Sequence, residues 1–159
     1  MSNIKNIDEL VEIRKNLKAE NKKVVFTNGC FDIIHAGHVD YLTKSKALGD
    51  ILIVGVNSDF SVRKIKGEKR PILSERERAY IISNIKPVDY VTLFDEDTPG
   101  KLIETLVPDI LVKGADWAIE NIVGRDIVVA NGGEVKTIEF VNDQSTSKII
   151  KTVLERYKS

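Results

Sequence analysis

Apolar positions along the chain change between two spacings, and the changes predict an alternation of helices and strands. Some stretches carry apolar residues three and four apart, the spacing of one face of a helix. Others are short apolar runs without alternation, which is typical of strands buried on both faces of a parallel sheet. The predicted helices span 7–20, 36–48, 74–85, a segment starting at 98 or 99, 122–131 and 145–157, and the predicted strands span 24–26, 51–56, 88–93, 110–112 and 135–140.

This order of elements predicts an α/β fold with a mostly parallel sheet. A length of 159 residues is that of one domain, so we expect a single unit over 1–159, with the helix within 1–22 packed on it. In such sheets ligands bind beyond the carboxyl ends of the strands. The unusual segments of this chain all follow predicted strands, which places them at one edge.

The segment 24–38, VVFTNGCFDIIHAGH, reads as a strand, a turn broken at Asn28 and Gly29, and the start of a helix. Free N–H groups and the helix dipole favour an anion at such a place. The only two histidines of the chain, His35 and His38, lie here with Gly37 between them. They could ligate a metal, act as acid and base, or bind phosphate. An i, i+3 pair alone does not complete a metal site, so phosphate binding and acid–base chemistry are favoured.

Three other strand-end segments carry candidate chemistry. The stretch 61–70 is read as a basic loop, in which Lys66 and Arg70 flank Gly67 and are the two side chains expected to reach the site. The segment 114–117, GADW, either borders a flat base or is a plain turn with a core tryptophan. Hydroxyls at 145–147 either cap the last helix or form a second anion site.

Composition narrows the class of protein. Lys plus Arg and Asp plus Glu both number 24, so no global charge points to nucleic acid. The single cysteine, Cys30, fits a reducing compartment and is interpreted as a small packing residue rather than a nucleophile. No apolar run approaches the roughly 20 residues of a membrane span. We therefore expect a soluble cytoplasmic protein without a membrane partner.

Residues 29–38, GCFDIIHAGH, resemble the GxFDxxHxGH signature of the cytidylyltransferase-like nucleotidyltransferases. The resemblance implies a Rossmann-like three-layer α/β/α fold with a five-stranded parallel sheet. It also implies transfer of a nucleoside monophosphate from a nucleoside triphosphate to a phosphorylated acceptor, with release of pyrophosphate. No P-loop motif and no GxGxxG after the first strand compete with this interpretation.

Within that superfamily the chain looks most like the D-glycero-β-D-manno-heptose 1-phosphate adenylyltransferases. The similar segments are Lys66-Gly67 with Arg70-Pro71, VDYV at 88–91, FDEDTP at 94–99, PD at 108–109 with LVKG at 111–114, and STS at 145–147. This implies ATP (or CTP) and a sugar 1-phosphate as substrates, ADP-heptose as the product and a role in lipopolysaccharide synthesis. It also implies a unit that stands alone, whereas in some relatives it is fused to a sugar kinase.

The resemblance further implies roles for individual residues. A Mg²⁺ ion is expected on the triphosphate, without protein ligands. The catalytic residues would be His35, His38 and Lys66, with Lys66 and Arg70 binding the acceptor. The nucleotide would be bound by Asn28, Gly29, Cys30, Phe31, Asp32, Gly37, Arg78, Gly114, Asp116, Trp117, Ser145, Thr146 and Ser147.

Two alternative functions are compatible with the sequence. A glycerol 3-phosphate cytidylyltransferase shares the first motif and a GDDW-like segment, but it has an Arg before the last helix that residues 140–144 lack, and another cation would have to replace it. A nucleotide-binding module without turnover is the alternative of another class, and the intact His35 and His38 pair argues against it. A homodimer is expected from the family and from symmetry.

Overall fold

The computed structural model describes residues 2–141 and 143–159. It contains a five-stranded sheet in the order β3-β2-β1-β4-β5, and every adjacent pair of strands is parallel. The order reverses between β1 and β4, so the switch point that favours ligand binding lies at their carboxyl ends. The strands are β1 (Val24–Gly29), β2 (Ile51–Asn57), β3 (Tyr90–Phe94), β4 (Ile110–Gly114) and β5 (Glu134–Ile138).

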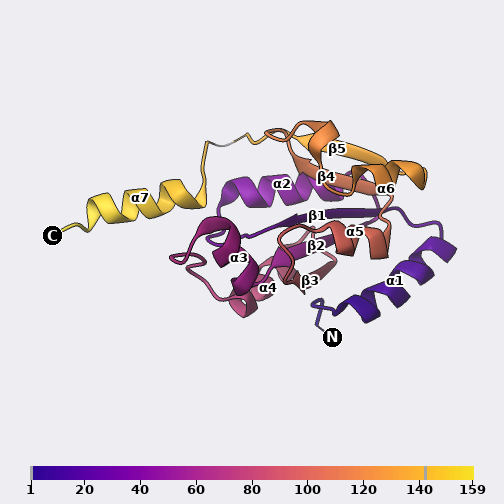
Figure 1. Cartoon of the computed structure of the whole chain (residues 1–159), viewed down its shortest axis with the longest axis horizontal. Coiled ribbons are helices and arrows are strands. Elements are labelled where there is room, and N and C mark those ends of the chain that lie inside the picture. Colours follow the sequence, from indigo (N-terminus) through magenta and orange to yellow (C-terminus); the bar gives the residue numbers. More distant parts are fainter. Residues whose placement is uncertain (1, 142) are drawn as a thin grey trace.

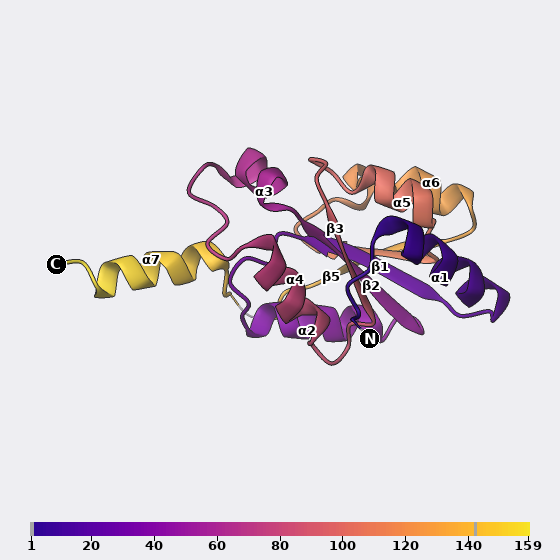
Figure 2. The same ribbon diagram turned by 90° about the horizontal axis from the view of Figure 1, so that it is seen from below.

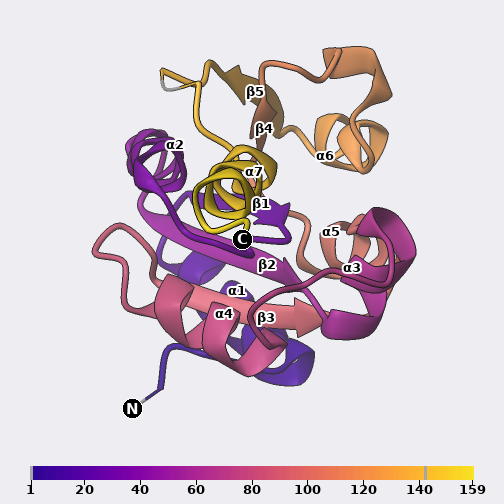
Figure 3. The same cartoon turned by 90° about the vertical axis from the view of Figure 1, so that its left-hand side faces the viewer.

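Helices cover both faces of this sheet (Figure 1). One core layer joins the strands to α2 and α4, and the other joins them to α1, α5 and α6. Viewed from the end in Figure 3, α2 and α5 lie on opposite sides of the central strands. The helices are α1 (Ile7–Ala19), α2 (Ala36–Lys46), α3 (Asp59–Lys66), α4 (Glu75–Ser83), α5 (Gly100–Leu106), α6 (Arg125–Ala130) and α7 (Thr146–Arg156).

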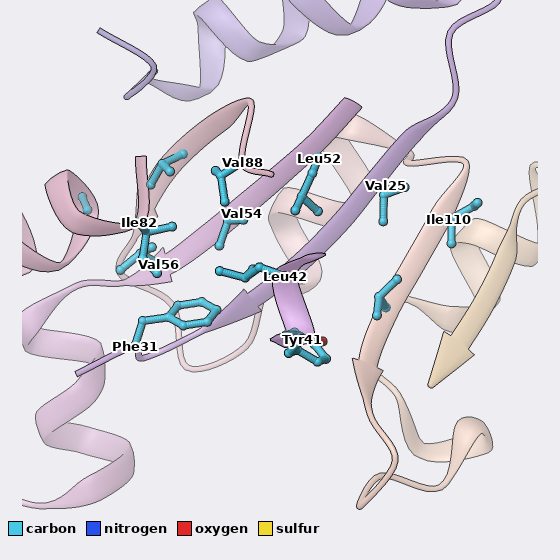
Figure 4. Packing of buried hydrophobic residues seen from close by; sticks show 13 residues of the cluster. Val25, Phe31, Tyr41, Leu42, Leu52, Val54, Val56, Ile82, Val88 and Ile110 are labelled. Carbon is cyan, nitrogen blue, oxygen red and sulfur yellow. The ribbon is translucent and has the colours of Figure 1, made fainter. Parts of the chain in front are cut away.

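The apolar strands produce this arrangement because alternate side chains enter opposite layers. Val25 of β1 packs in the layer of Leu42 from α2, whereas its neighbour Phe26 packs in the layer of Ile103 from α5. Figure 4 shows the first of these layers, with Val25, Leu52 and Val54 facing Leu42. The fold predicted from the alternating pattern, a parallel five-stranded α/β/α unit, is confirmed.

The last helix differs from the others. Figures 1 and 2 both show α7 extending away from the layered body, and none of its residues is buried. Its first turn nevertheless lies beside the β1–α2 turn, because the Thr146 hydroxyl donates a hydrogen bond to the Ile33 carbonyl at 3.2 Å. Among the described residues, no helix has both the length and the apolar character required to cross a membrane.

Two local predictions were wrong. Strand β1 does not stop before Asn28, since Asn28 and Gly29 pair with Gly55 and Val56 of β2 and so continue the ladder. The stretch 61–70 is not a loop throughout, because α3 occupies it as far as Lys66. The Ser58 side chain accepts a hydrogen bond from the Ser61 N–H and caps this helix. The sequence of α3 is mostly charged and only two of its residues are buried, so it lacks the apolar spacing that predicts a helix.

Smaller differences occur at element ends. The predicted helix 122–131 is shorter in the structure, where α6 spans Arg125–Ala130 and a separate 3₁₀ turn precedes it at Ile119–Asn121. Strand β5 ends at Ile138 rather than at residue 140.

Candidate active site

A cleft of about 700 Å³ opens at the carboxyl ends of β1, β2 and β4. The first turns of α2 and α7 meet on one side of it, and the end of α3 and the start of α5 border the other. Most residues predicted to form the site line this cleft. They are Asn28, Gly29, Cys30, Phe31, Asp32, His35, His38, Lys66, Arg70, Trp117, Ser145, Thr146 and Ser147.

The two histidines stack on each other at the start of α2. His35 is the N-cap residue, and the centroid of its ring lies 3.9 Å from that of His38 with 29° between the ring planes. Phe31 contacts the other side of the pair, with its ring edge-on to His38 at 5.4 Å. The stack holds both rings at the mouth of a helix whose free N–H groups favour an anion.

The hydrogen bonding of His38 determines which of its ring nitrogens faces a ligand as a donor. The His35 backbone N–H donates to Nδ1 of His38 at 3.4 Å, so the proton of the neutral ring resides on Nε2. Burial, with a smaller contribution from His35, lowers the pKa of His38 to about 4. Burial also lowers the pKa of His35. Both rings are therefore neutral at pH 7 in the absence of a ligand, and a polyphosphate would favour their protonation.

One ring nitrogen of His35 accepts and donates no hydrogen bond within the described part of the chain. Its Nδ1 is buried without a hydrogen-bond partner among the described residues, and a buried polar atom left without a partner is costly. Gly37 makes room for this ring, because a Cβ at Gly37 would lie 3.0 Å from both Cε1 and Nδ1 of His35. Gly37 itself does not line the cleft, so its effect on the site is exerted through the ring of His35.

The turn between β1 and α2 has a strained backbone. Phe31 has a φ of 48°, in the left-handed region that non-glycine residues rarely adopt. The ring of Phe31 lies against Gly29, where an added Cβ would be 3.0 Å from it. Strain of this kind persists only where the surroundings hold it, and it clusters at functional sites.

Asp32 holds that turn against the segment after α3. Its buried carboxylate accepts hydrogen bonds from the backbone N–H groups of Ile72 and Leu73 at 2.9 Å and from Nε of Arg70 at 2.6 Å. Burial alone would raise the pKa of Asp32, but the two backbone donors and Arg70 outweigh it and hold the pKa below its usual value. Asp32 therefore orders the turn and fixes Arg70 beside the cleft.

Arg78 lies below the cleft rather than on its wall. Its side chain is fully buried and donates to the carbonyls of Cys30 at 2.6 Å and Asn57 at 2.7 Å, and to the Asp59 carboxylate at 2.9 Å. The predicted contact with a nucleotide has no open path in this arrangement. Arg78 instead ties the ends of β1 and β2 to α3, which fixes the floor of the cleft.

The segment after β4 contributes one wall in part. Trp117 lines the cleft, but Gly114 and Asp116 do not. Gly114 is packed against other residues, since an added Cβ would lie 2.4 Å from the Phe140 ring and 2.6 Å from an Asp116 carboxylate oxygen. The structure therefore does not bring Gly114 and Asp116, which were predicted to border the nucleobase, to the wall of the cleft.

Ser145 caps α7 by accepting a hydrogen bond from the Lys148 N–H at 3.1 Å. Thr146 and Ser147 line the cleft beside the helix N-terminus, where the Thr146 hydroxyl donates to the Ile33 carbonyl. The two helix starts, α2 and α7, thus lie on the same side of the cleft, which suits a chain of phosphate groups spanning them.

Sequence reasoning missed several residues that line the cleft. Lys113 at the end of β4 is half-buried, and its ammonium lies 5.5 Å from the centroid of the Trp117 ring. A cation at the end of an otherwise apolar strand was the signal available for it. Asn57, Ile65, Asp97, Thr98, Pro99, Val123, Phe140, Asp143, Gln144 and Lys148 also line the cleft.

Cys30 lines the cleft, but its surroundings do not favour a thiolate. Burial raises the pKa of the Cys30 thiol, with nearby Lys66 opposing the effect in part. A nucleophilic cysteine requires the opposite shift. The arrangement can instead bind phosphate groups through neutral donors, helix N-termini and the cations Lys66, Arg70 and Lys113.

Comparisons with known proteins fit this geometry. The family model described as cytidylyltransferase-like matches residues 26–152, which include the strand, the histidine turn and the start of α7. The chain belongs to the cytidylyltransferase-like family. The resemblance of GCFDIIHAGH to the signature of this family is thereby confirmed.

Curated relatives narrow the comparison. The chain is 58% identical over 156 residues to "Bifunctional protein HldE" of Citrifermentans bemidjiense and 54% identical over 154 residues to the protein of that name in Geobacter metallireducens. These alignments cover 98% and 97% of this chain but only 32% and 31% of those relatives. The chain therefore spans about a third of the length of the curated relatives it matches.

Two solved structures share the fold. A lipopolysaccharide core biosynthesis protein from Thermoplasma volcanium superposes with a TM-score of 0.61 at 32% identity, covering 77% of this chain and 99% of that one. A pantoate-β-alanine ligase from Francisella tularensis superposes with a TM-score of 0.60 at 15% identity, over 91% of this chain and 68% of that one. The second likeness concerns the fold alone.

Proposed function

We propose that this chain transfers AMP from ATP to D-glycero-β-D-manno-heptose 1-phosphate, forming ADP-heptose and pyrophosphate. The observation that carries the proposal is the stacked pair His35 and His38 at the start of α2, facing the same cleft as the start of α7. The likeness to bifunctional HldE proteins and to a lipopolysaccharide core biosynthesis protein supports the choice of a sugar phosphate.

In this reaction an oxygen of the acceptor phosphate attacks the α-phosphorus of ATP, and the bond from that phosphorus to the bridging oxygen of the β-phosphate breaks. His35 and His38 would donate to the phosphate oxygens on which charge accumulates, while Thr146 and Ser147 would hold the β- and γ-phosphates at the start of α7. The protein needs no covalent intermediate, since positioning and charge stabilisation supply the acceleration.

A Mg²⁺ ion on the triphosphate would neutralise part of its charge. Within residues 2–141 and 143–159, no group of three or more His, Cys, Asp and Glu side chains is arranged to hold a metal ion. The cleft wall carries hydroxyl groups and cations, which suit phosphate oxygens, and also the side chains of Asp97 and Asp143. We expect the ion to be held by the oxygens of the nucleotide.

A pyrophosphate-release assay over a panel of nucleoside triphosphates and sugar phosphates tests the proposal. ATP with heptose 1-phosphate is expected to give the highest kcat/KM. A higher kcat/KM with CTP and glycerol 3-phosphate would instead indicate the alternative cytidylyltransferase. Nucleotide binding without pyrophosphate release from any pair would instead indicate a binding module.

A further inference from the structure

The ends of β1 and β4 carry two polar side chains on the face of the sheet that lies opposite α2. Phe26 and Leu111 are paired in the β1–β4 register, and both belong to the core layer that contains α5. Two residues further along each strand, the same face is occupied by Asn28 and Lys113. The Cβ that a side chain at Gly55 would have lies close to both Phe26 and Asn28, which agrees with this assignment.

Among the described residues, the Asn28 side-chain oxygen and the Lys113 ammonium have no hydrogen-bond or ion-pair partner. The Asn28 Oδ1 atom is buried and accepts no hydrogen bond from the described residues. Lys113 is half-buried, and across 2–141 and 143–159 its ammonium has neither a carboxylate within ion-pair distance nor a hydrogen-bond acceptor. Burial lowers the pKa of Lys113 below its ordinary value. A cation and an acceptor left open side by side are suited to a ligand that has both a phosphate and a hydroxyl group.

The in-line geometry of the proposed reaction indicates which substrate lies beside Asn28 and Lys113. The histidines and the start of α7 occupy the α2 side, so the departing pyrophosphate would lie there. Phosphoryl-group transfer needs the attacking and leaving oxygens roughly in line. The attacking phosphate must therefore come from the other side, where the cleft is lined by Lys66 at the end of α3 and by Lys113.

We propose that Lys113 and Asn28 form the subsite for the acceptor, with Lys113 binding its phosphate and Asn28 Oδ1 accepting a hydrogen bond from a hydroxyl of its sugar. This inference rests on the proposed nucleotidyl transfer to a sugar phosphate. It adds Lys113 of β4 to the predicted acceptor residues Lys66 and Arg70. Lys113 is therefore not the cation that replaces, at the triphosphate, the Arg that residues 140–144 lack.

Titration of inorganic phosphate into protein saturated with α,β-methylene-ATP tests the role of Lys113 without turnover. Trp117 is the single tryptophan of the chain and lies beside the Lys113 ammonium, so its emission reports binding. Lys113→Met is expected to weaken phosphate binding about 10- to 100-fold, the loss typical of one charged hydrogen bond. Lys113→Arg should stay within a few-fold of the wild type, and all variants should bind the ATP analogue with unchanged affinity.

Lys101→Met is the matched control, since Lys101 lies on α5 on the same face of the sheet but its side chain is 79% exposed and forms an ion pair with Glu96. It should leave phosphate binding unchanged. Equal phosphate affinity in Lys113→Met and the wild type would overturn the inference. Weaker binding of the ATP analogue in Lys113→Met would also overturn it, because Lys113 would then serve the nucleotide.

Asn28→Ala separates the two halves of the subsite. It should weaken binding of heptose 1-phosphate at least several-fold while leaving the affinity for inorganic phosphate within two-fold, and an affinity for heptose 1-phosphate equal to that of the wild type would contradict the hydroxyl contact. These measurements differ from the test of the proposed function. Absence of pyrophosphate release by the wild type would refute the reaction, whereas wild-type turnover with unaltered phosphate binding in Lys113→Met would refute only the subsite.

Discussion

Gly37→Ala should slow catalysis without destabilising the protein. Gly37 is the second residue of α2, and an added Cβ would lie 3.0 Å from Cε1 and Nδ1 of the His35 ring. Carbon atoms in favourable contact are about 3.5 to 4.0 Å apart. The His35 ring must therefore move by roughly 0.5 to 1 Å, and its stacking on His38 would change with it.

The size of the kinetic effect follows from that displacement. A misplacement of about 1 Å at a reacting group costs on the order of 10²-fold, so we expect kcat to fall about 10- to 100-fold. Stability should change in the other direction or not at all, because alanine is favoured over glycine within a helix by up to about 1 kcal/mol. A rise in the free energy of unfolding together with a fall in kcat would separate ring displacement from damage to the fold.

Both quantities can be measured on the same variants. The assay is pyrophosphate release under saturating substrates, with urea unfolding for stability. The control is the same substitution in a His35→Ala background, where no ring remains to be displaced and no further loss of kcat is expected. A wild-type kcat in Gly37→Ala would refute the reasoning, as would an equal loss in both backgrounds.

Three further predictions concern the residues that hold the site. Between pH 7 and pH 5, His38 takes up a proton in the unfolded chain, where its pKa is near 6.5, but stays neutral in the folded chain, where its pKa is about 4. The wild type should therefore lose about 2 kcal/mol more stability than His38→Gln between these two pH values, as measured by urea unfolding. Asp32→Asn should lower the free energy of unfolding by about 3 kcal/mol and raise the KM for the acceptor, because it leaves Arg70 without its carboxylate, and an unchanged KM would contradict that link. Arg78→Met should cost about 3 to 5 kcal/mol in thermal or urea unfolding, since the buried Cys30 and Asn57 carbonyls lose their donor, and a loss below 1 kcal/mol would contradict its place under the cleft.

The fold was predictable because strands that are buried on both faces of a sheet consist of runs of consecutive apolar residues. Such runs, at 24–26 and 51–56 for example, identify parallel strands with little ambiguity. The predictions failed where a polar sequence forms regular structure. Asn28 and Gly29 look like a turn but pair with β2, and the charged segment of α3 has only Ser61 and Val62 buried, which is too short an apolar pattern to read.

The candidate site was predictable where local geometry sets it. His35, His38 and the hydroxyl groups at the start of α7 each begin a helix, so their place at the sheet edge follows from the chain order. The positions of Arg78 and Lys113 did not follow. Arg78 is buried because backbone carbonyls from separate segments surround it. Contacts with backbone carbonyls cannot be predicted from the types of the residues that carry them. Lys113 required knowledge of which face of β4 opens into the cleft.

The most direct test of the account follows the α-phosphate of ATP. Protein incubated with ATP labelled at the α-phosphate and with heptose 1-phosphate should give a labelled nucleotide sugar and unlabelled pyrophosphate, and His35→Ala and His38→Ala should each lower kcat at least about 10²-fold. A loss confined to KM would contradict the role given to the histidines. Absence of a labelled nucleotide sugar, with nucleotide still bound, would contradict the transfer itself.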